Sequence, residues 1–218
     1  NGISIRGMPS NLTQWRLEGV SIVNPNHLSN AGTISDQPSV AAGGVNMLSA
    51  QMLDNSQLHT GAFPIEQSNV IGGLMDMQLR EGNNQEGECT LQAGLLGLDM
   101  SMEGPFSRNS DVSYLMNYRY SFTGLLTNFG IDFDGESISF EDFAVTINVP
   151  TKKMGDFKIF GIKGRSRNFK KGVDPEIASS VFETPDVLYE SGTDILGLSH
   201  EKSVGQKSSL KTSVVYSR

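Results

Sequence analysis

The chain has 218 residues, a net charge of −7 and a pI near 5.0. A phosphate-binding face needs clustered Lys and Arg, so this charge argues against a nucleic-acid partner. The single cysteine, Cys89, excludes an internal disulfide framework and a cysteine-based zinc site. His27, His59 and His200 lie far apart in sequence, which favours scattered histidines over a metal site, and no cofactor is predicted.

The first 84 residues are short segments separated by Gly, Asn and Pro. Alternation of apolar and polar residues predicts strands at 3–6, 15–18, 20–23 and 74–79. The second and third strands flank Gly19 and predict a hairpin. Residues 24–40 predict an exposed loop, whereas residues 45–53 fit either a turn of helix or an extended segment. A polar hinge follows at 81–88.

Beyond residue 88 the alternation becomes longer. Apolar residues occupy odd positions up to Leu95 and even positions from Leu96, so a bulge or a tight hairpin is predicted there. Residues 112–122 are apolar at every even position, and eleven residues at ~3.3 Å each span ~36 Å, longer than most soluble strands. Further strands are predicted at 143–149, 157–163, 187–202 and 208–216. Short turns alternate with long loops and no apolar run reaches ~20 residues, a pattern typical of outer-membrane barrels.

Several short motifs occur in a fixed order along the chain. They are Ile5-Arg6-Gly7, Leu17-Glu18-Gly19-Val20, Asn24-Pro25-Asn26-His27-Leu28, Gly61-Ala62-Phe63-Pro64, Gly72-Gly73-Leu74-Met75-Asp76-Met77 and Glu103-Gly104-Pro105. In order and spacing they resemble the TonB-dependent outer-membrane receptors, especially those of Bacteroidetes-type bacteria. The resemblance covers residues 1–165 through motifs and the remainder through strand pattern.

The resemblance implies a mainly β fold with two parts. Residues 1–84 correspond to the C-terminal portion of a small α+β plug domain, and residues 85–218 to the first antiparallel strands, about seven, of a truncated transmembrane β-barrel. Such barrels have about twenty-two strands. The change of phase near Leu95 then marks two strands, 88–94 and 97–103.

The resemblance also implies a function and partners. A receptor of this family, in the bacterial outer membrane and in contact with its lipid, imports a scarce external solute such as a siderophore, glycan, peptide or cobalamin. The periplasmic protein TonB acts on an N-terminal segment that these 218 residues do not contain, and a surface lipoprotein partner would indicate glycans or peptides.

Candidate site residues follow from the same resemblance. Asn24, Asn26 and His27 correspond to a segment at the top of the plug, where ligand contact and a plain turn are both consistent with the sequence. Arg6 is either a strand residue on a polar face or a plug charge paired with barrel glutamates. The sequence departs from the family at Glu18, where Asp is usual, and at Thr60, where some branches carry Arg.

Other functions were weighed against this one. A non-transporting surface adhesion or assembly module built from β-sandwich domains is the alternative, but long strands with outward aromatic residues favour the barrel. Asp132, Asp134 and Glu136 depart from the calcium-loop pattern and indicate a plain acidic loop. Asp54, Ser56 and His59 have no nucleophile elbow, so no enzyme activity is predicted.

Overall fold

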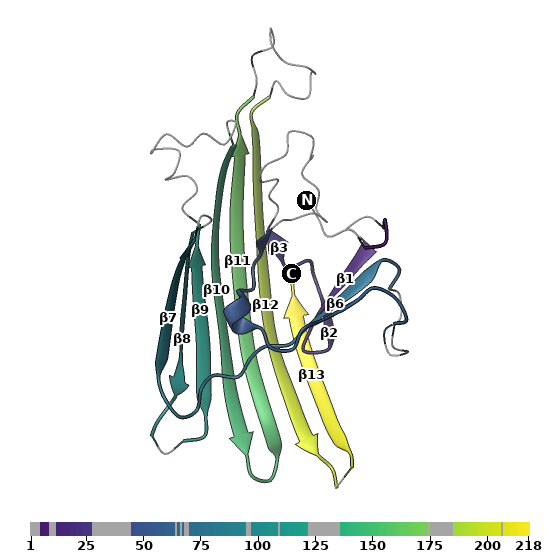
Figure 1. Cartoon of the computed structure of the whole chain (residues 1–218), viewed down its shortest axis with the longest axis vertical. Helices are drawn as coiled ribbons and strands as arrows, with labels where there is room; N and C mark the ends of the chain where they lie inside the picture. The colour runs from purple at the N-terminus through teal and green to yellow at the C-terminus, as the bar shows by residue number, and fades with distance from the viewer. Residues whose placement is uncertain are drawn as a thin grey trace.

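The computed structural model describes residues 5–8, 12–27, 45–63, 65, 67, 70–94, 97–108, 110–121, 136–172, 174, 185–205 and 207–218. These residues form a small four-stranded sheet near the N-terminus and a tall, curved seven-stranded sheet (Figure 1). Strands dominate the described residues, which confirms the predicted mainly β fold. No helix in this part of the chain has the length and apolar character to cross a membrane.

The small sheet combines one hairpin with two later strands. Its order is β2 (Val20–Ile22), β1 (Thr13–Leu17), β6 (Gly73–Met77) and β5 (Gln57–His59). Trp15 lies opposite Ile22, which confirms the predicted hairpin, while β1 and β6 run parallel. Glu18 and Gly19 connect the hairpin with φ values of 51° and 83°, the pattern of a two-residue type I′ turn.

The segment whose type the sequence left open contains both kinds of structure. β3 (Asn26–His27) pairs with β4 (Val45–Asn46), and the 3-10 helix η2 (Ala50–Met52) follows. The Ser49 hydroxyl accepts a hydrogen bond from the Gln51 N–H and so caps the helix. We refer to residues 5–80 as the N-terminal segment.

The large sheet has an up-and-down order in which every neighbouring pair is antiparallel. Its strands are β7 (Glu88–Gly94), β8 (Gly97–Pro105), β9 (Ser113–Tyr120), β10 (Glu136–Thr151), β11 (Gly155–Lys170), β12 (Val187–Ser203) and β13 (Ser209–Ser217). Gly94 lies opposite Gly97, so the change of phase is a tight hairpin between two strands, as the resemblance implied. The described residues beyond position 87 thus form seven strands, the number that the resemblance implied.

Some sequence predictions fall outside the described residues. They include Asp132 and Asp134 of the acidic loop and residues 28–40 of the predicted loop 24–40. The connections from β9 to β10 and from β11 to β12 also lie largely outside. At the opposite end of the sheet the described turns are short, for example the one that joins Thr151 to Gly155.

The two faces of the large sheet differ in burial. The inner face packs against the N-terminal segment, and Leu115, Phe160 and Ile162 are buried there against Met52 and Leu17. Burying a side chain of this size contributes about 1.5–3 kcal/mol. Gly197 leaves space beside the Phe160 ring, which a Cβ would overlap.

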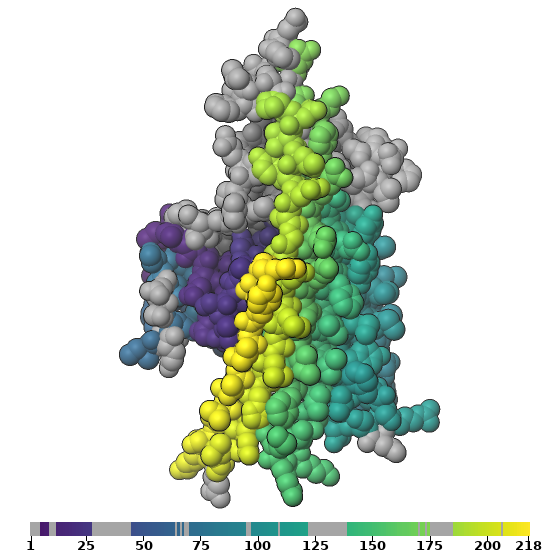
Figure 2. Space-filling model, turned by 180° about the vertical axis from the view of Figure 1, so that it is seen from behind, coloured from purple at the N-terminus to yellow at the C-terminus, as the bar shows by residue number. Residues whose placement is uncertain are grey.

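The outer face is exposed and apolar in its middle. Figure 2 shows this face, with the N-terminal segment projecting beyond the β13 side. Its exposed apolar side chains include Leu98, Met100, Met102, Tyr118, Tyr120, Phe143, Ile159, Leu196, Leu198, Val214 and Tyr216.

Candidate functional site at the inner face of the large sheet

The Glu18 carboxylate connects the N-terminal segment to two strands of the large sheet. Its Oε1 accepts a hydrogen bond from Lys158 Nζ at 3.0 Å, and its Oε2 accepts one from Lys211 Nζ at 3.0 Å. The Leu79 N–H donates to Oε1 at 3.0 Å, and Lys158 also donates to the Leu79 carbonyl at 2.8 Å. One side chain in the β1–β2 turn thus holds Leu79, just after β6, together with β11 and β13.

Glu18 is 2% exposed, so its charge depends on these partners. Burial alone would raise the pKa of the Glu18 carboxyl, but the charge of Lys158 and the hydrogen bonds from Leu79, Lys211 and Lys158 outweigh burial and lower the pKa. Glu18 also has positive φ, a conformation that Asn or Asp adopts more easily. The longer Glu side chain therefore reaches the lysines from a turn position that disfavours it.

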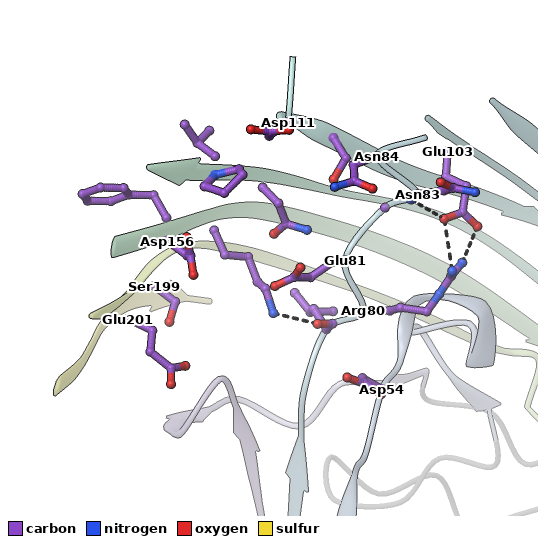
Figure 3. Close-up of a pocket in the computed structure, with 18 of the residues that line it drawn as sticks. Asp54, Arg80, Glu81, Asn83, Asn84, Glu103, Asp111, Asp156, Ser199 and Glu201 are labelled. Atoms are coloured by element: carbon purple, nitrogen blue, oxygen red, sulfur yellow. Dashed lines mark hydrogen bonds and ion pairs between the residues drawn. The ribbon is translucent and has the colours of Figure 1, made fainter. Parts of the chain in front are cut away.

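A second clamp lies where the chain leaves the N-terminal segment. Arg80 donates from Nη1 and Nη2 to the two carboxylate oxygens of Glu103 on β8, at 3.1 and 2.6 Å. The Asn83 backbone N–H donates to the same carboxylate at 2.8 Å, and Figure 3 draws these contacts of Glu103 as dashed lines. Arg80 Nε also donates to the Gln51 carbonyl at 3.1 Å. Such a bidentate pair fixes direction as well as distance.

The crossover segment, residues 79–88, packs closely on the large sheet. A Cβ at Gly82 would overlap the Tyr114 carbonyl oxygen of β9, so only glycine fits at this point. Between this segment and the short-turn end of the sheet lies a polar cleft of about 680 Å³. Figure 3 shows its charged lining, in which acids outnumber bases, with the labelled carboxylates Asp54, Glu81, Glu103, Asp111, Asp156 and Glu201.

Asp99 on β8 is the centre of a hydrogen-bond network with η2. Its Oδ2 accepts from the Ser49 hydroxyl at 2.7 Å, and its Oδ1 accepts from Gln51 Nε2 at 3.2 Å. Asn117 Nδ2 on β9 donates to Oδ1 at 2.6 Å. Ser101 donates to Gln51 Oε1. These contacts orient the 3-10 helix on the inner face.

A third group of charges lies farther from the short turns. His27 Nε2 is 2.7 Å from Asp142 Oδ1, without hydrogen-bond geometry, and both side chains are buried. The His27 ring stacks on Phe140 with centroids 5.1 Å apart. Arg119 lies over the same ring and donates from Nη1 to the Asn46 carbonyl at 2.6 Å. β3 and β4 are thereby held against β9 and β10.

The structure places the sequence-predicted site residues in two different locations. Asn24 and Asn26 are partly exposed, and Asn24 Oδ1 accepts from the Asn26 N–H at 3.1 Å in a local turn. His27 follows them but faces the large sheet. Arg6 is exposed with its guanidinium beside Gly61, and no ion pair of Arg6 occurs among the described residues.

Sequence reasoning missed the residues that connect the two sheets. The sequence pattern marks Glu18 only as a departure from the usual Asp, and it gives no comparable mark to Arg80, Glu103, Lys158 and Lys211. The alternation of residues along the strand was one available signal. Lys158 lies between the outward residues Phe157 and Ile159, so its side chain faces inward, where a partly buried cation requires a carboxylate partner. The described residues contain no cluster of three or more His, Cys, Asp or Glu able to hold a metal ion.

Comparisons with known proteins gave structural matches alone. No model of a protein family matches the sequence, and no curated protein matches it. The siderophore receptor PirA from Acinetobacter baumannii matches with a TM-score of 0.44 and 11% identity, over 98% of this chain and 41% of that one. A mutant of the ferric enterobactin receptor PfeA from Pseudomonas aeruginosa, in complex with enterobactin, matches with a TM-score of 0.47 and 11% identity. PfeA in complex with BCV-L6 matches with 0.47 and 12%. Both PfeA matches cover 98% of this chain and 42% of the receptor, so the chain spans about two fifths of each structure.

Proposed function

We propose that the chain is part of a TonB-dependent outer-membrane receptor of the Bacteroidetes type. In this proposal residues 1–84 are the C-terminal portion of the plug domain, and residues 85–218 are the first strands of the barrel. The function is energised uptake of a scarce external solute. The observation that carries the proposal is the contrast between the two faces of the large sheet. The outer face is an exposed apolar band, whereas the inner face carries buried polar and charged residues beside an apolar cluster and packs against the N-terminal segment.

The outer band has the length and borders that suit a bilayer. On β10 the outward residues from Phe143 to Val149 are apolar over about 20 Å of strand at ~3.3 Å per residue, a large part of the apolar stretch of a membrane-spanning strand. Tyr118 and Tyr120 lie toward one border, where barrels carry aromatic girdles. At that border the outward residues on β11 become basic, with Lys163 opposite Phe143 and Arg165 opposite Glu141.

The alternative, a β-sandwich adhesion or assembly module, predicts the opposite arrangement. Two packed sheets bury apolar inner faces and expose polar outer ones. Here the exposed face is apolar, and the buried face carries Asp142, Asn117 and Glu103 beside its apolar cluster. An exposed apolar face opposite a partly polar buried one favours a wall between lipid and the interior of a barrel.

Ligand recognition is proposed for the end of the molecule that carries the long connections, which barrels place outside the cell. Asn24 and Asn26 are the proposed ligand contacts of the plug, because both remain partly exposed. His27 would have to leave Asp142 before it could touch a ligand. The imported solute is a siderophore, glycan, peptide or similar molecule, with TonB as periplasmic partner and a surface lipoprotein as partner if the solute is a glycan or peptide.

Cell fractionation tests the proposal directly. We expect the full-length protein in the outer-membrane fraction, extracted only by detergent, and migrating faster on gels before boiling than after. Recovery from the soluble periplasm without detergent would contradict the barrel. Growth of a deletion strain and of a strain without TonB on defined iron and carbon sources then identifies the solute, and an uptake defect shared by both strains is expected.

A further inference from the structure

The outer face has a crevice where one side chain is missing from an otherwise continuous apolar row. The row runs across the strands through Met116, Val145, Gly161, Leu196 and Tyr216. A Cβ at Gly161 would lie 3.7 Å from Val145 Cγ1 and 3.8 Å from Leu196 Cδ1, so there is room for a side chain that the sequence does not supply. The resulting crevice measures about 340 Å³, and Phe143 and Tyr216 also line it.

The rim of this crevice on the side of the long connections is basic. Lys163 follows Gly161 on the same face of β11, opposite Phe143 and Asp194. Asp194 is already paired with Arg218, whose Nη2 lies 3.0 Å from Oδ2. The next outward residue is Arg165. Neither Lys163 nor Arg165 has an ion pair among the residues that the structure describes.

The nearby acids compensate these cations only in part. Glu141 lies opposite Arg165 in the sheet, and its Oε1 accepts a hydrogen bond from the Tyr118 hydroxyl at 2.8 Å, which leaves the charge of the carboxylate in place. Glu190 lies 3.6 Å from Arg167. Lys163 and Arg165 together with Glu141 therefore leave a net positive charge at the border of the apolar band, directly beside an open apolar crevice.

We propose that the crevice binds one phosphorylated, anionic acyl lipid of the outer leaflet, with a hydrocarbon chain over Gly161 and the phosphate against Lys163 and Arg165. The inference rests on the proposed function, because the outer face must lie in a bilayer. Phosphate oxygens accept charge-assisted hydrogen bonds from both side-chain types. The basic rim points toward the long connections, which places the headgroup on the outer side.

Native mass spectrometry of the full-length protein in a mild non-ionic detergent tests this site. The wild type is expected to retain one phosphorylated lipid. Gly161→Leu fills the crevice, and a Lys163→Ala, Arg165→Ala double variant removes the rim charges, so both are expected to lose that lipid. The matched control is Lys152→Ala with Lys153→Ala in the short β10–β11 turn, which removes two exposed lysines at the opposite end and is expected to retain it.

Adding lipid back distinguishes the contribution of the lipid headgroup to binding from that of the acyl chains. Delipidated wild type is expected to bind phosphatidylglycerol about tenfold more tightly than phosphatidylcholine with the same acyl chains, and the double variant is expected to lose that preference. Equal retention by wild type and both crevice variants, or equal loss in the turn control, would overturn the site. A protein that fractionates with the outer membrane but holds no discrete lipid refutes this inference alone, whereas a soluble protein refutes the proposed function.

Discussion

The inner and outer faces of the large sheet are built from the same strands, but their side chains are stabilised in different ways. On the inner face, Glu18, Glu103 and Asp99 each contact specific donors from the N-terminal segment or from neighbouring strands. On the outer face, side chains such as Leu198 and Val214 are apolar and exposed. The stability of the inner face therefore depends on the identity and geometry of single residues. The stability of the middle of the outer face requires that its side chains remain apolar.

The largest effect is expected from removing the charge of Glu18. Glu18→Gln leaves Lys158 and Lys211 without their carboxylate, and loss of one partner from a buried ion pair costs about 3 kcal/mol. We expect the N-terminal segment of the detergent-solubilised protein to become sensitive to protease. The control is Glu190→Gln, which removes an exposed pair with Arg167 and should have almost no effect. Equal cleavage of the two variants would show that the inner face is not specific.

The outer face should reject charge but accept any apolar residue. Leu198→Arg places a cation in the middle of the band and is expected to destabilise the protein in lipid by about 2–3 kcal/mol. Leu198→Phe should be neutral. Denaturant unfolding in lipid vesicles measures both variants, and an arginine that is tolerated as well as phenylalanine would contradict a lipid-facing surface.

A smaller effect is expected at the clamp of the crossover segment. Arg80→Ala removes two hydrogen bonds to Glu103 but leaves the Asn83 N–H on the same carboxylate, so we expect a loss of about 1–2 kcal/mol. Arg80→Lys keeps the charge but not the bidentate geometry and should fall between alanine and wild type. Hydrogen exchange of residues 79–88 reports the loosening; unchanged exchange in the alanine variant would argue against a clamp.

The smallest expected effect is a loss of stability at acidic pH. Because the pKa of Glu18 is lowered in the folded protein, its stabilisation is fully present above the ordinary value of 4.5 and is lost as the pH falls through the lowered folded value. Protease sensitivity of the N-terminal segment should therefore rise below that ordinary value. The Glu18→Gln variant should lack this part of the pH dependence, and an identical profile in both proteins would assign the effect to another group.

The fold could be predicted from the sequence because strand alternation is local. The change of phase near Leu95 required a bulge or a tight hairpin, and the family resemblance implied the hairpin that the structure shows. The alternation of Phe157 and Ile159 with polar residues indicated one face of β11. The length of β10 was underestimated at 143–149, since ladder pairing with β11 continues from Glu136 to Thr151, past the apolar band. Backbone pairing does not require an apolar pattern, so strand ends outside the band have no hydropathy signal.

The inner-face contacts could not be predicted in the same way. Glu18 and Lys211 are paired across strands that share no local pattern, and the type I′ turn that presents Glu18 would by itself favour Asn or Asp. Arg6, which the family resemblance suggested for a contact between plug and barrel, has its guanidinium beside Gly61. The proposed functions of Arg6, Asn24, Asn26 and His27 remain predictions.

The distance in sequence between Glu18 and its lysines has a consequence for the order of folding. Lys158 lies 140 residues after Glu18, and Lys211 lies 193 residues after it. Each strand of the large sheet pairs only with its neighbours along the chain, so the sheet can grow hairpin by hairpin from contacts that are nearby in sequence. We expect the N-terminal segment to be the last part to become protease-resistant in pulse-proteolysis during refolding. A chain that lacks β13 should form the other six strands. Its first eighty residues should still be open to cleavage, because Lys211, one of the two cations that hold Glu18, lies on β13.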